Sequence, residues 1–267
     1  MMEPRHLVIA RALLSEIDGG RYEPGDSLPT EEQLMASYGT SRNTVRRALQ
    51  ELANRGRIDI KQGSGSTVRR PRRPIVHVAS SIEGIPDDER YARYVERMSK
   101  EQTEEPRLRF QARRGPAGGR IARLLRIDPN RPGAFVLCRR CDRMFGARLW
   151  ERQLSYYPGH IAEGSELETP EDIPTGTKEV LAAMGYPQTR HWDVIRAEMP
   201  SIKDSDRFGM GPGIPLLVHE RLAFSGDTPI RYTVTRMPAD RHHLMYVEGD
   251  TSEDDLLDAL QANTYDD

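Results

Sequence analysis

Apolar side chains recur at helical spacing in three segments near the start of the chain. The first segment runs from Arg5 to Gly19, and a second, shorter one begins after Thr30, whose hydroxyl can cap a helix. The third begins after Ser41 and ends at Gly56, and Gly39 permits a tight turn before it. The predicted inward stripes are Leu7, Ile9, Ala10, Leu13, Leu14 and Ile17; Leu34, Met35 and Tyr38; and Val45, Ala48, Leu49 and Leu52. A short helix, a turn with glycine and a longer helix predict a helix-turn-helix.

Alternating apolar and polar residues follow directly after the third helix. Residues 57–61 and 66–70 have the period of two that is typical of strands, and they flank the sequence Gln62-Gly-Ser-Gly65. We therefore expect a basic β-hairpin with a glycine-rich tip.

Beyond residue 105 the pattern predicts strands joined by short connections, with a few helices between them. This arrangement favours an antiparallel sheet flanked by helices, and hence an α+β fold class. The expected strands are 108–113, 134–142, 149–157, 191–198, 216–224 and 230–237, and the expected helices are 119–125, 177–184 and 201–208.

The segments between and after these two regions have a different composition. Residues 69–74 read Arg-Arg-Pro-Arg-Arg-Pro, which favours an extended connector, and Tyr91, Tyr94, Val95 and Met98 predict a short helix over 88–100. The end of the chain is acidic. We expect four parts: a helix-turn-helix domain over 1–73, a linker over 74–104, a second domain over 105–248 and an acidic tail over 249–267.

Charge is distributed unevenly along a chain whose formal net charge is only −2. Residues 40–73 hold ten lysines and arginines but only two acidic residues, Glu51 and Asp59. A compact basic segment on an acidic protein indicates a polyanion site, although a solvated basic face has the same composition.

The third predicted helix carries polar and basic side chains off its apolar stripe. Arg42, Asn43, Arg46 and Arg47 lie near its N-terminal end, which is the end that enters the major groove in a helix-turn-helix. Arginine forks match guanine O6 and N7, and asparagine matches adenine. Together with Lys61 and Gly65 of the hairpin, these residues predict an interface with double-stranded DNA.

The run from Pro24 to Val68, PGDSLPTEEQLMASYGTSRNTVRRALQELANRGRIDIKQGSGSTV, resembles the winged helix-turn-helix of the GntR family of bacterial transcription regulators. The resemblance extends over roughly residues 5–70. It implies that Ser41, Arg42, Thr44 and Arg46 contact phosphates and base edges, with Gln62 and Gly63 at the wing tip. Glu32 departs from the family, in which many members carry arginine at this position, and this departure indicates a different operator.

The second domain is similar to the UTRA effector domain of the HutC-type branch of that family. The similarity rests on SYYP at 155–158, EVLAAMGY at 179–186, GGRIARLLRIDP, and the run from Gly211 to Tyr246. It implies a chorismate-lyase-like fold, binding of a small molecule without catalysis, and dimerisation through this domain.

Three pairs of residues are candidates for contacts with the effector. The family often places arginines on the strand that holds Arg139 and Arg140, where they meet acidic or phosphorylated ligands. Adjacent strand residues point to opposite faces, so at most one of these two arginines faces a pocket. The other candidates are Ser155 and Tyr157 on the next strand, and Arg231 and Tyr232 after the hairpin.

The sequence offers little support for catalysis, metal binding or redox activity. Cys138 and Cys141 form a CxxC on a predicted strand, where positions three apart face opposite sides, and no second cysteine pair completes a zinc site. His242-His243 would diverge in the same way on a strand. The nucleophile-elbow, zincin, dinucleotide-binding and Walker motifs are absent. We therefore expect no catalytic residues, no metal and no cofactor.

Neither a membrane-spanning run nor a secretory signal is found, so we expect a cytoplasmic protein. The leading hypothesis is a repressor that binds an inverted-repeat operator as a homodimer and is modulated by a small-molecule effector of unknown identity. Two alternatives stay open: a DNA-binding dimer that responds to no effector, and a chorismate-lyase-like enzyme with a DNA anchor.

Overall fold

The computed structural model describes residues 3–61, 63, 65–70, 75–78 and 106–246. The chain divides into two compact units. The first comprises Met1–Pro74 and Met199–Pro215, and the second comprises Ile75–Glu198 and Leu216–Asp267. Helix α8 (Ile202–Phe208) therefore belongs to the first unit by this division, although its sequence lies inside the predicted second domain.

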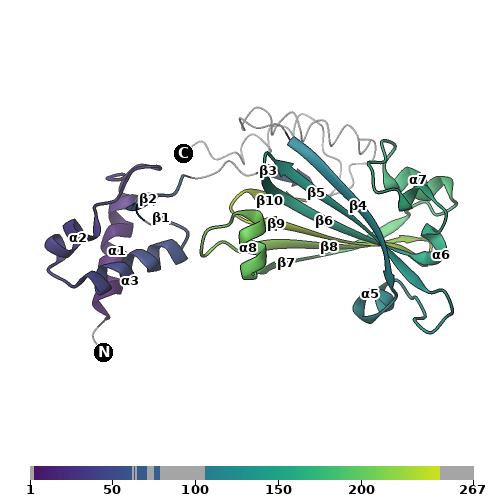
Figure 1. The fold of residues 1–267 in the computed structure, drawn as a ribbon, viewed down its shortest axis with the longest axis horizontal. Coiled ribbons are helices and arrows are strands. Elements are labelled where there is room, and N and C mark those ends of the chain that lie inside the picture. Colours follow the sequence, from purple (N-terminus) through teal and green to yellow (C-terminus); the bar gives the residue numbers. More distant parts are fainter. Residues whose placement is uncertain (1–2, 62, 64, 71–74, 79–105, 247–267) are drawn as a thin grey trace. The chain divides into compact units, whose positions relative to one another are not determined.

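Three helices form the first unit's N-terminal part, as the apolar stripes predict (Figure 1). They are α1 (Arg5–Asp18), α2 (Glu31–Tyr38) and α3 (Arg42–Asn54). Thr30 and Gln33 form a reciprocal capping box at the start of α2, and the Ser41 hydroxyl caps α3. Between the two helices Gly39 has a φ of +52°, a left-handed conformation that glycine adopts without steric cost. Local sequence thus fixes both the start of α3 and the turn before it.

A short hairpin follows α3. Strands β1 (Ile58–Lys61) and β2 (Gly65–Val68) pair antiparallel, with Lys61 opposite Gly65. This confirms the predicted wing, with strands slightly shorter than the alternation suggested.

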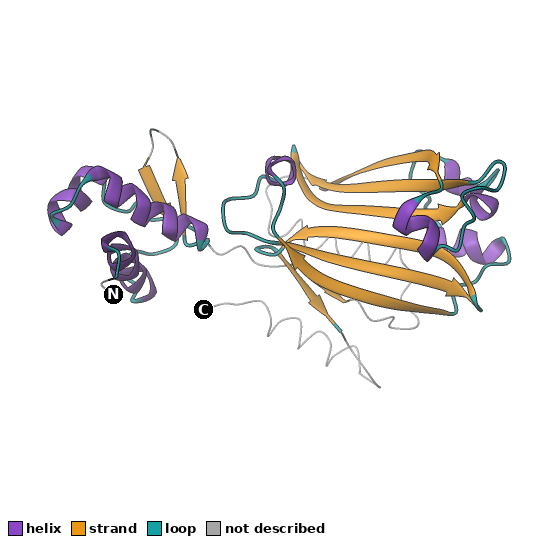
Figure 2. Ribbon diagram, turned by 90° about the horizontal axis from the view of Figure 1, so that it is seen from below, coloured by secondary structure: helices purple, strands orange, loops and turns teal. Residues whose placement is uncertain are grey.

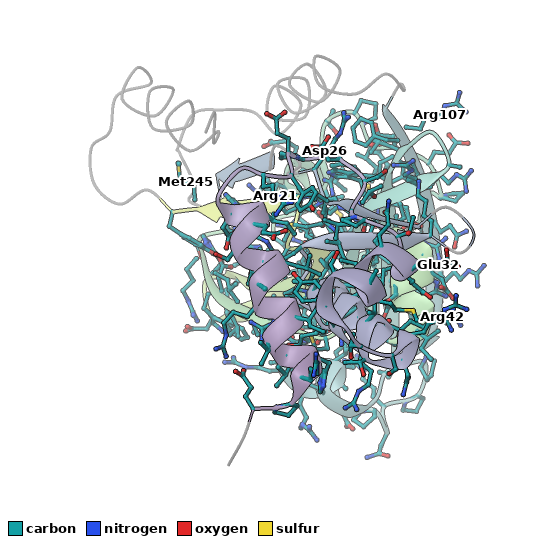
Figure 3. All side chains as sticks on the ribbon, turned by 90° about the vertical axis from the view of Figure 1, so that its left-hand side faces the viewer. Arg21, Asp26, Glu32, Arg42, Arg107 and Met245 are labelled. Carbon is teal, nitrogen blue, oxygen red and sulfur yellow. The ribbon has the colours of Figure 1, made fainter. Side chains whose placement is uncertain are left out.

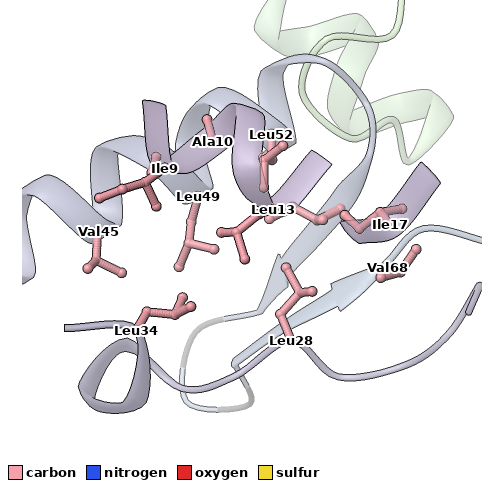
Figure 4. Close-up of a cluster of buried hydrophobic side chains, with 13 residues drawn as sticks. Ile9, Ala10, Leu13, Ile17, Leu28, Leu34, Val45, Leu49, Leu52 and Val68 are labelled. Carbon is pink, nitrogen blue, oxygen red and sulfur yellow. The ribbon is translucent and has the colours of Figure 1, made fainter. Parts of the chain in front are cut away.

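One apolar core joins these elements (Figure 4). Leu13 of α1, Leu34 of α2 and Leu52 of α3 are all buried, and Ile58 and Val68 add the wing to the same cluster. Helix α3 therefore packs against side chains from α1, α2 and the hairpin.

The second unit is built on a six-stranded antiparallel sheet with the order β4-β5-β6-β9-β8-β7 (Figure 1). The sequence predicted all six strands within a few residues of their bounds, which confirms the α+β class. The strands are β4 (Pro106–Pro116), β5 (Phe135–Phe145), β6 (Arg148–Pro158), β7 (Arg190–Glu198), β8 (Leu216–Ser225) and β9 (Thr228–Pro238).

Short helices gather toward one end of this sheet (Figure 2). A buried cluster that contains Leu137, Tyr157, Ile161 and Leu181 packs two of the helices and the 3-10 turn against one sheet face. These elements are α6 (Gly159–Ala162), η1 (Glu166–Glu168) and α7 (Thr177–Ala183), while α5 (Gly119–Leu124) contacts the sheet at β9. The sequence predicted α5 and α7 but missed α6 and η1.

A second, two-stranded sheet pairs segments that are far apart in the chain. Strand β3 (Ile75–Val78) runs parallel to β10 (His242–Met245). Neither segment is among the strands expected from the sequence, and residues 75–78 fall within the expected linker over 74–104. A parallel pair between distant segments depends on tertiary contacts that neighbouring residues do not reveal. The helix predicted over 88–100 and the acidic tail over 249–267 lie outside the described residues.

Candidate functional site

The N-terminal end of α3 presents the predicted DNA-contacting residues to solvent. Ser41, Arg42, Asn43, Arg46 and Arg47 are exposed and Thr44 is half-buried, whereas Val45, Ala48 and Leu49 point into the core. The Ser41 hydroxyl lies 3.0 Å from that of Thr44 and accepts a hydrogen bond from the Thr44 backbone N–H. The exposed side of α3 thus carries three arginine forks and an amide.

The wing carries the remaining residues that are predicted to contact DNA. Lys61 is exposed at the end of β1, and Gly63 and Gly65 have φ values of +80° and +84°. Gln62, also predicted to contact DNA, lies outside the described residues. Gly63 and Gly65 adopt these conformations without strain, and neither has a Cβ that would obstruct close approach of a partner.

Two acidic side chains of α2 contact the arginines of α3. The Nε of Arg46 donates to Glu31 Oε1 at 2.8 Å, and the Nε of Arg42 lies 3.5 Å from Glu31 Oε2. The Nη2 of Arg42 lies 3.6 Å from Glu32 Oε1, and Figure 3 shows these two residues together. The sequence drew attention to Glu32 but missed Glu31, because the contact joins residues on two helices.

The six effector candidates divide between the two faces of the sheet. Strand alternation and the register of the sheet put Arg139, Ser155, Tyr157 and Arg231 on the face covered by α6, η1 and α7. Arg140 and Tyr232 point to the opposite face. The expectation that Arg139 and Arg140 point apart is met, and the six residues do not form one cluster.

Arg139 is buried and donates hydrogen bonds that connect the loop over residues 167–171 to the sheet. Its Nη1 donates to the carbonyl oxygen of Leu167 at 2.7 Å and also to that of Thr169, and its Nη2 donates to that of Glu171 at 2.8 Å. Burial lowers the pKa of this guanidinium from its ordinary value. All three acceptors are neutral, so the positive charge has no carboxylate in contact among the described residues.

Arg231 lies on the same face and is only 8% exposed. Its Nη1 donates to Thr177 Oγ1 at 3.0 Å and its Nη2 to Gln188 Oε1 at 2.8 Å, while its buried Nε has no hydrogen-bond partner in the described structure. The buried Asp142 of this unit, by contrast, pairs with Arg152. Burying a cation among neutral groups lowers the free energy of unfolding, because two neutral acceptors replace only part of its hydration.

The opposite face has its own charged cluster around Glu220. This carboxylate is 2% exposed and contacts the guanidinium groups of Arg120 and Arg196, with Tyr232 beside it. Burial acts to raise the pKa of Glu220, but the hydrogen bonds from these partners outweigh it and lower the pKa to about 2. Burial, together with the hydrogen bond to Glu220, raises the pKa of Tyr232 to about 12. Tyr232 is therefore a neutral partner of a paired carboxylate.

The structure brings together two histidines that are scattered in the sequence. His191 and His219 lie near Asp193, whose carboxylate also accepts two hydrogen bonds of 2.7 Å from Arg221. Burial and the positive charge of Arg221 lower the pKa of His191. Only the register between β7 and β8 reveals this cluster, so no sequence motif could have indicated it.

A groove of about 660 Å³ opens beside β10. It is lined by Ile195, Leu217, Ala239 and residues 242–246. Its walls are largely apolar, and none of the six effector candidates lines it.

The two cysteines are free and point to opposite faces of β5. Burial raises the pKa of Cys141 to about 11 and also raises that of Cys138, so both are held as neutral thiols. Over the described residues there is no group of three or more His, Cys, Asp or Glu that could hold a metal ion. In the same part of the chain, every helix is too short or too polar to cross a membrane.

Comparison with known families matches both units. The model described as bacterial regulatory proteins, gntR family, matches residues 6–68, and the UTRA domain model matches residues 105–243. The second match alone covers more than half of the chain.

Two curated relatives are similar to the N-terminal unit only. The HTH-type transcriptional regulator TreR of Bacillus subtilis is 44% identical over 64 residues, which are 24% of this chain and 27% of TreR. The mannosyl-D-glycerate transport/metabolism system repressor MngR of Escherichia coli is 40% identical over 70 residues, 26% of this chain and 29% of MngR. The matched segment thus spans just over a quarter of each relative.

A solved structure assigned to the GntR family of transcriptional regulators resembles the whole chain. It has a TM-score of 0.66 at 22% identity, and the match covers 93% of this chain and 99% of that one. At this identity the likeness shows the shared fold.

Proposed function

The chain belongs to the GntR family of bacterial regulatory proteins and carries a UTRA domain in the HutC-type arrangement, and from this premise we propose that it is a transcriptional repressor. It binds an inverted-repeat operator as a homodimer in the cytoplasm, and a small-molecule effector in the UTRA domain modulates that binding. One observation carries the DNA-binding part: α3 exposes Arg42, Asn43 and Arg46 at its N-terminal end while the rest of the helix is anchored in the core.

Replacing Arg46 with alanine tests this proposal. Operator duplexes are first enriched from a random pool with the wild-type protein. Arg46→Ala should weaken binding to them by about 1–3 kcal/mol, because a bidentate contact to a base is lost. Gel-shift titration over a series of salt concentrations measures the change.

Arg55→Ala is the matched control, because Arg55 is exposed and follows the other end of α3, where it pairs with Glu51. It should leave operator affinity nearly unchanged. Equal affinities of wild type and Arg46→Ala would reject this surface as the reading surface.

We also propose that the effector is a small anion that contacts Arg231, with Arg139, Ser155 and Tyr157 on the same sheet face. The support is the cost of burying two guanidinium groups that contact no carboxylate among the described residues, together with the unpartnered Nε of Arg231. A ligand that supplies negative charge would remove this cost, so binding would stabilise the folded unit. Arg140 and Tyr232 face away and are left out of this site.

Arg231→Met should have opposite effects on stability and on ligand response. Without ligand, the variant should be more stable by about 1 kcal/mol, because a buried cation with an unpaired N–H is replaced by an apolar side chain of similar length. It should also lose any thermal stabilisation that phosphate, succinate or citrate gives the wild type. Urea unfolding and thermal-shift titration measure these two effects.

Arg190→Met is the control, because it removes an exposed arginine from the same unit. It should retain the wild-type ligand response. A loss of more than about 1 kcal/mol in Arg231→Met would mean that the charge of Arg231 is compensated in the free protein.

A further inference from the structure

The carboxylate of Glu31 bridges the two arginines of the reading helix through their Nε atoms. Oε1 accepts from Arg46 at 2.8 Å, and Oε2 lies 3.5 Å from the Nε of Arg42. In an arginine fork the two terminal Nη groups make the bidentate contact to guanine O6 and N7. A carboxylate on the Nε side therefore holds the side chain and leaves the reading end of Arg46 available.

The base of this bridge is rigid. Glu31 is the first residue of α2, directly after Thr30, whose hydroxyl accepts from the Gln33 N–H while the Gln33 side chain accepts from the Thr30 N–H. Glu31 is 33% exposed, so neighbouring atoms shelter it more than they shelter Arg42 or Arg46, which are each more than half exposed. A capped helix and a half-sheltered carboxylate restrict where the two guanidinium groups can lie.

The bridge contributes little to folding. Exposed ion pairs add little to the free energy of folding, because both partners are well solvated when they separate. Its effect on recognition is larger, since each flexible side chain ordered at an interface reduces affinity unless it is ordered beforehand. Glu31 orders two such side chains before DNA binds.

We infer that Glu31 is a positioning residue that sets sequence discrimination by orienting Arg46 and Arg42 toward base edges; this rests on the proposed DNA-binding function. A contact to phosphate requires a positive charge, but the side chain can approach in many orientations. A bidentate contact to a base requires the charge and a defined orientation of the guanidinium group. Loss of Glu31 should therefore change the affinity for operator DNA and the affinity for random-sequence DNA in opposite directions. Affinity for selected operator duplexes falls, and affinity for random-sequence duplexes rises.

Glu32 provides a matched control on the same helix. It is 82% exposed and lies 3.6 Å from Arg42, so it repels phosphate but does not bridge the two Nε atoms. Glu32→Gln makes the same change in net charge as Glu31→Gln. It should raise affinity for selected and random duplexes by a similar factor of a few and leave their ratio unchanged.

The experiment measures the full chain on two probes: a duplex enriched by the wild-type protein and a random-sequence duplex, each over a salt series. For Glu31→Ala the ratio of selected to random affinity should fall about tenfold, with a smaller fall for Glu31→Gln, whose amide oxygen can still accept from Nε. Arg46→Ala is measured in parallel. Far-UV circular dichroism checks that each variant is folded. If Glu31→Ala is not folded, Glu31→Gln replaces it, because glutamine has nearly the same shape as glutamate.

The outcomes separate this inference from the proposed function. If Arg46→Ala weakens the selected duplex but Glu31→Ala and Glu31→Gln keep the wild-type ratio, or change it no more than Glu32→Gln does, the positioning role is overturned and DNA binding stands. If the wild type enriches no sequence, the proposed function fails, and the positioning role fails with it.

Discussion

An Arg120→Met/Arg196→Met double variant is expected to lose about 3–5 kcal/mol of folding free energy in the second unit. Glu220 is 2% exposed and contacts both guanidinium groups, so their removal leaves a buried carboxylate whose remaining partner among the described residues is the Tyr232 hydroxyl. Urea unfolding followed by tryptophan fluorescence measures the loss. Both tryptophans of the sequence, Trp150 and Trp192, lie in this unit, so the signal reports on it alone.

Glu220→Gln is the control, because it should lower the free energy of unfolding by less than the double variant does. Arg120 and Arg196 are 54% and 41% exposed, so water can solvate both charges when the carboxylate is removed. Adding Glu220→Gln to the double variant should recover part of the lost stability, a non-additivity expected for residues of one network. A double variant no less stable than Glu220→Gln would show that the buried carboxylate does not depend on these arginines.

The pH dependence of stability provides a second measurement on the same variants. The folded pKa of Glu220, about 2, lies below its ordinary value of 4.5. Its ion pairs therefore stabilise the wild type fully above about pH 4.5, and this contribution is lost as the pH falls toward 2. In the double variant the two arginines are gone, so burial should raise the pKa of Glu220. Lowering the pH from about 4.5 toward 2 should therefore reduce its stability less than that of the wild type.

Leu52→Ala is expected to destabilise the first unit by about 2–5 kcal/mol and to abolish binding to operator duplexes under mild denaturant. Leu52 is fully buried on α3 and packs in the one cluster that holds all three helices and the wing together (Figure 4). The unit is small, so a loss of this size is a large part of its stability. Hydrogen exchange of α1 and α3 amides measures it directly.

Val8→Ala is the control for this variant. Val8 lies on α1 but is 48% exposed, so its replacement should change stability by no more than about 0.5 kcal/mol. Tryptophan fluorescence should stay at wild-type values in both variants, because the first unit contains no tryptophan. Wild-type exchange rates in Leu52→Ala would mean that the core does not depend on this side chain.

The candidate DNA surface could be read largely from the sequence, whereas the charged clusters of the second unit could not. Arg42, Asn43 and Arg46 share an exposed face because helical spacing separates them from Val45, Ala48 and Leu49. In the second unit the alternation along β5 correctly separated Arg139 from Arg140. It could not reveal that Arg139 donates to the carbonyl groups of residues 167–171, because that contact depends on how a distant loop folds over the sheet.

By itself, the sequence determined those features that depend on neighbours along the chain: the three helices with their caps at Thr30 and Ser41, the wing, and the existence of six antiparallel strands. Only the tertiary structure decided which charges meet: Glu31 with two arginines, Glu220 with Arg120 and Arg196, and Arg231 with no carboxylate in the described residues. The physical reason is one of range. Helical and strand periodicity repeat within a few residues, whereas pairing of distant side chains depends on strand register and helix packing, which no short stretch of sequence encodes.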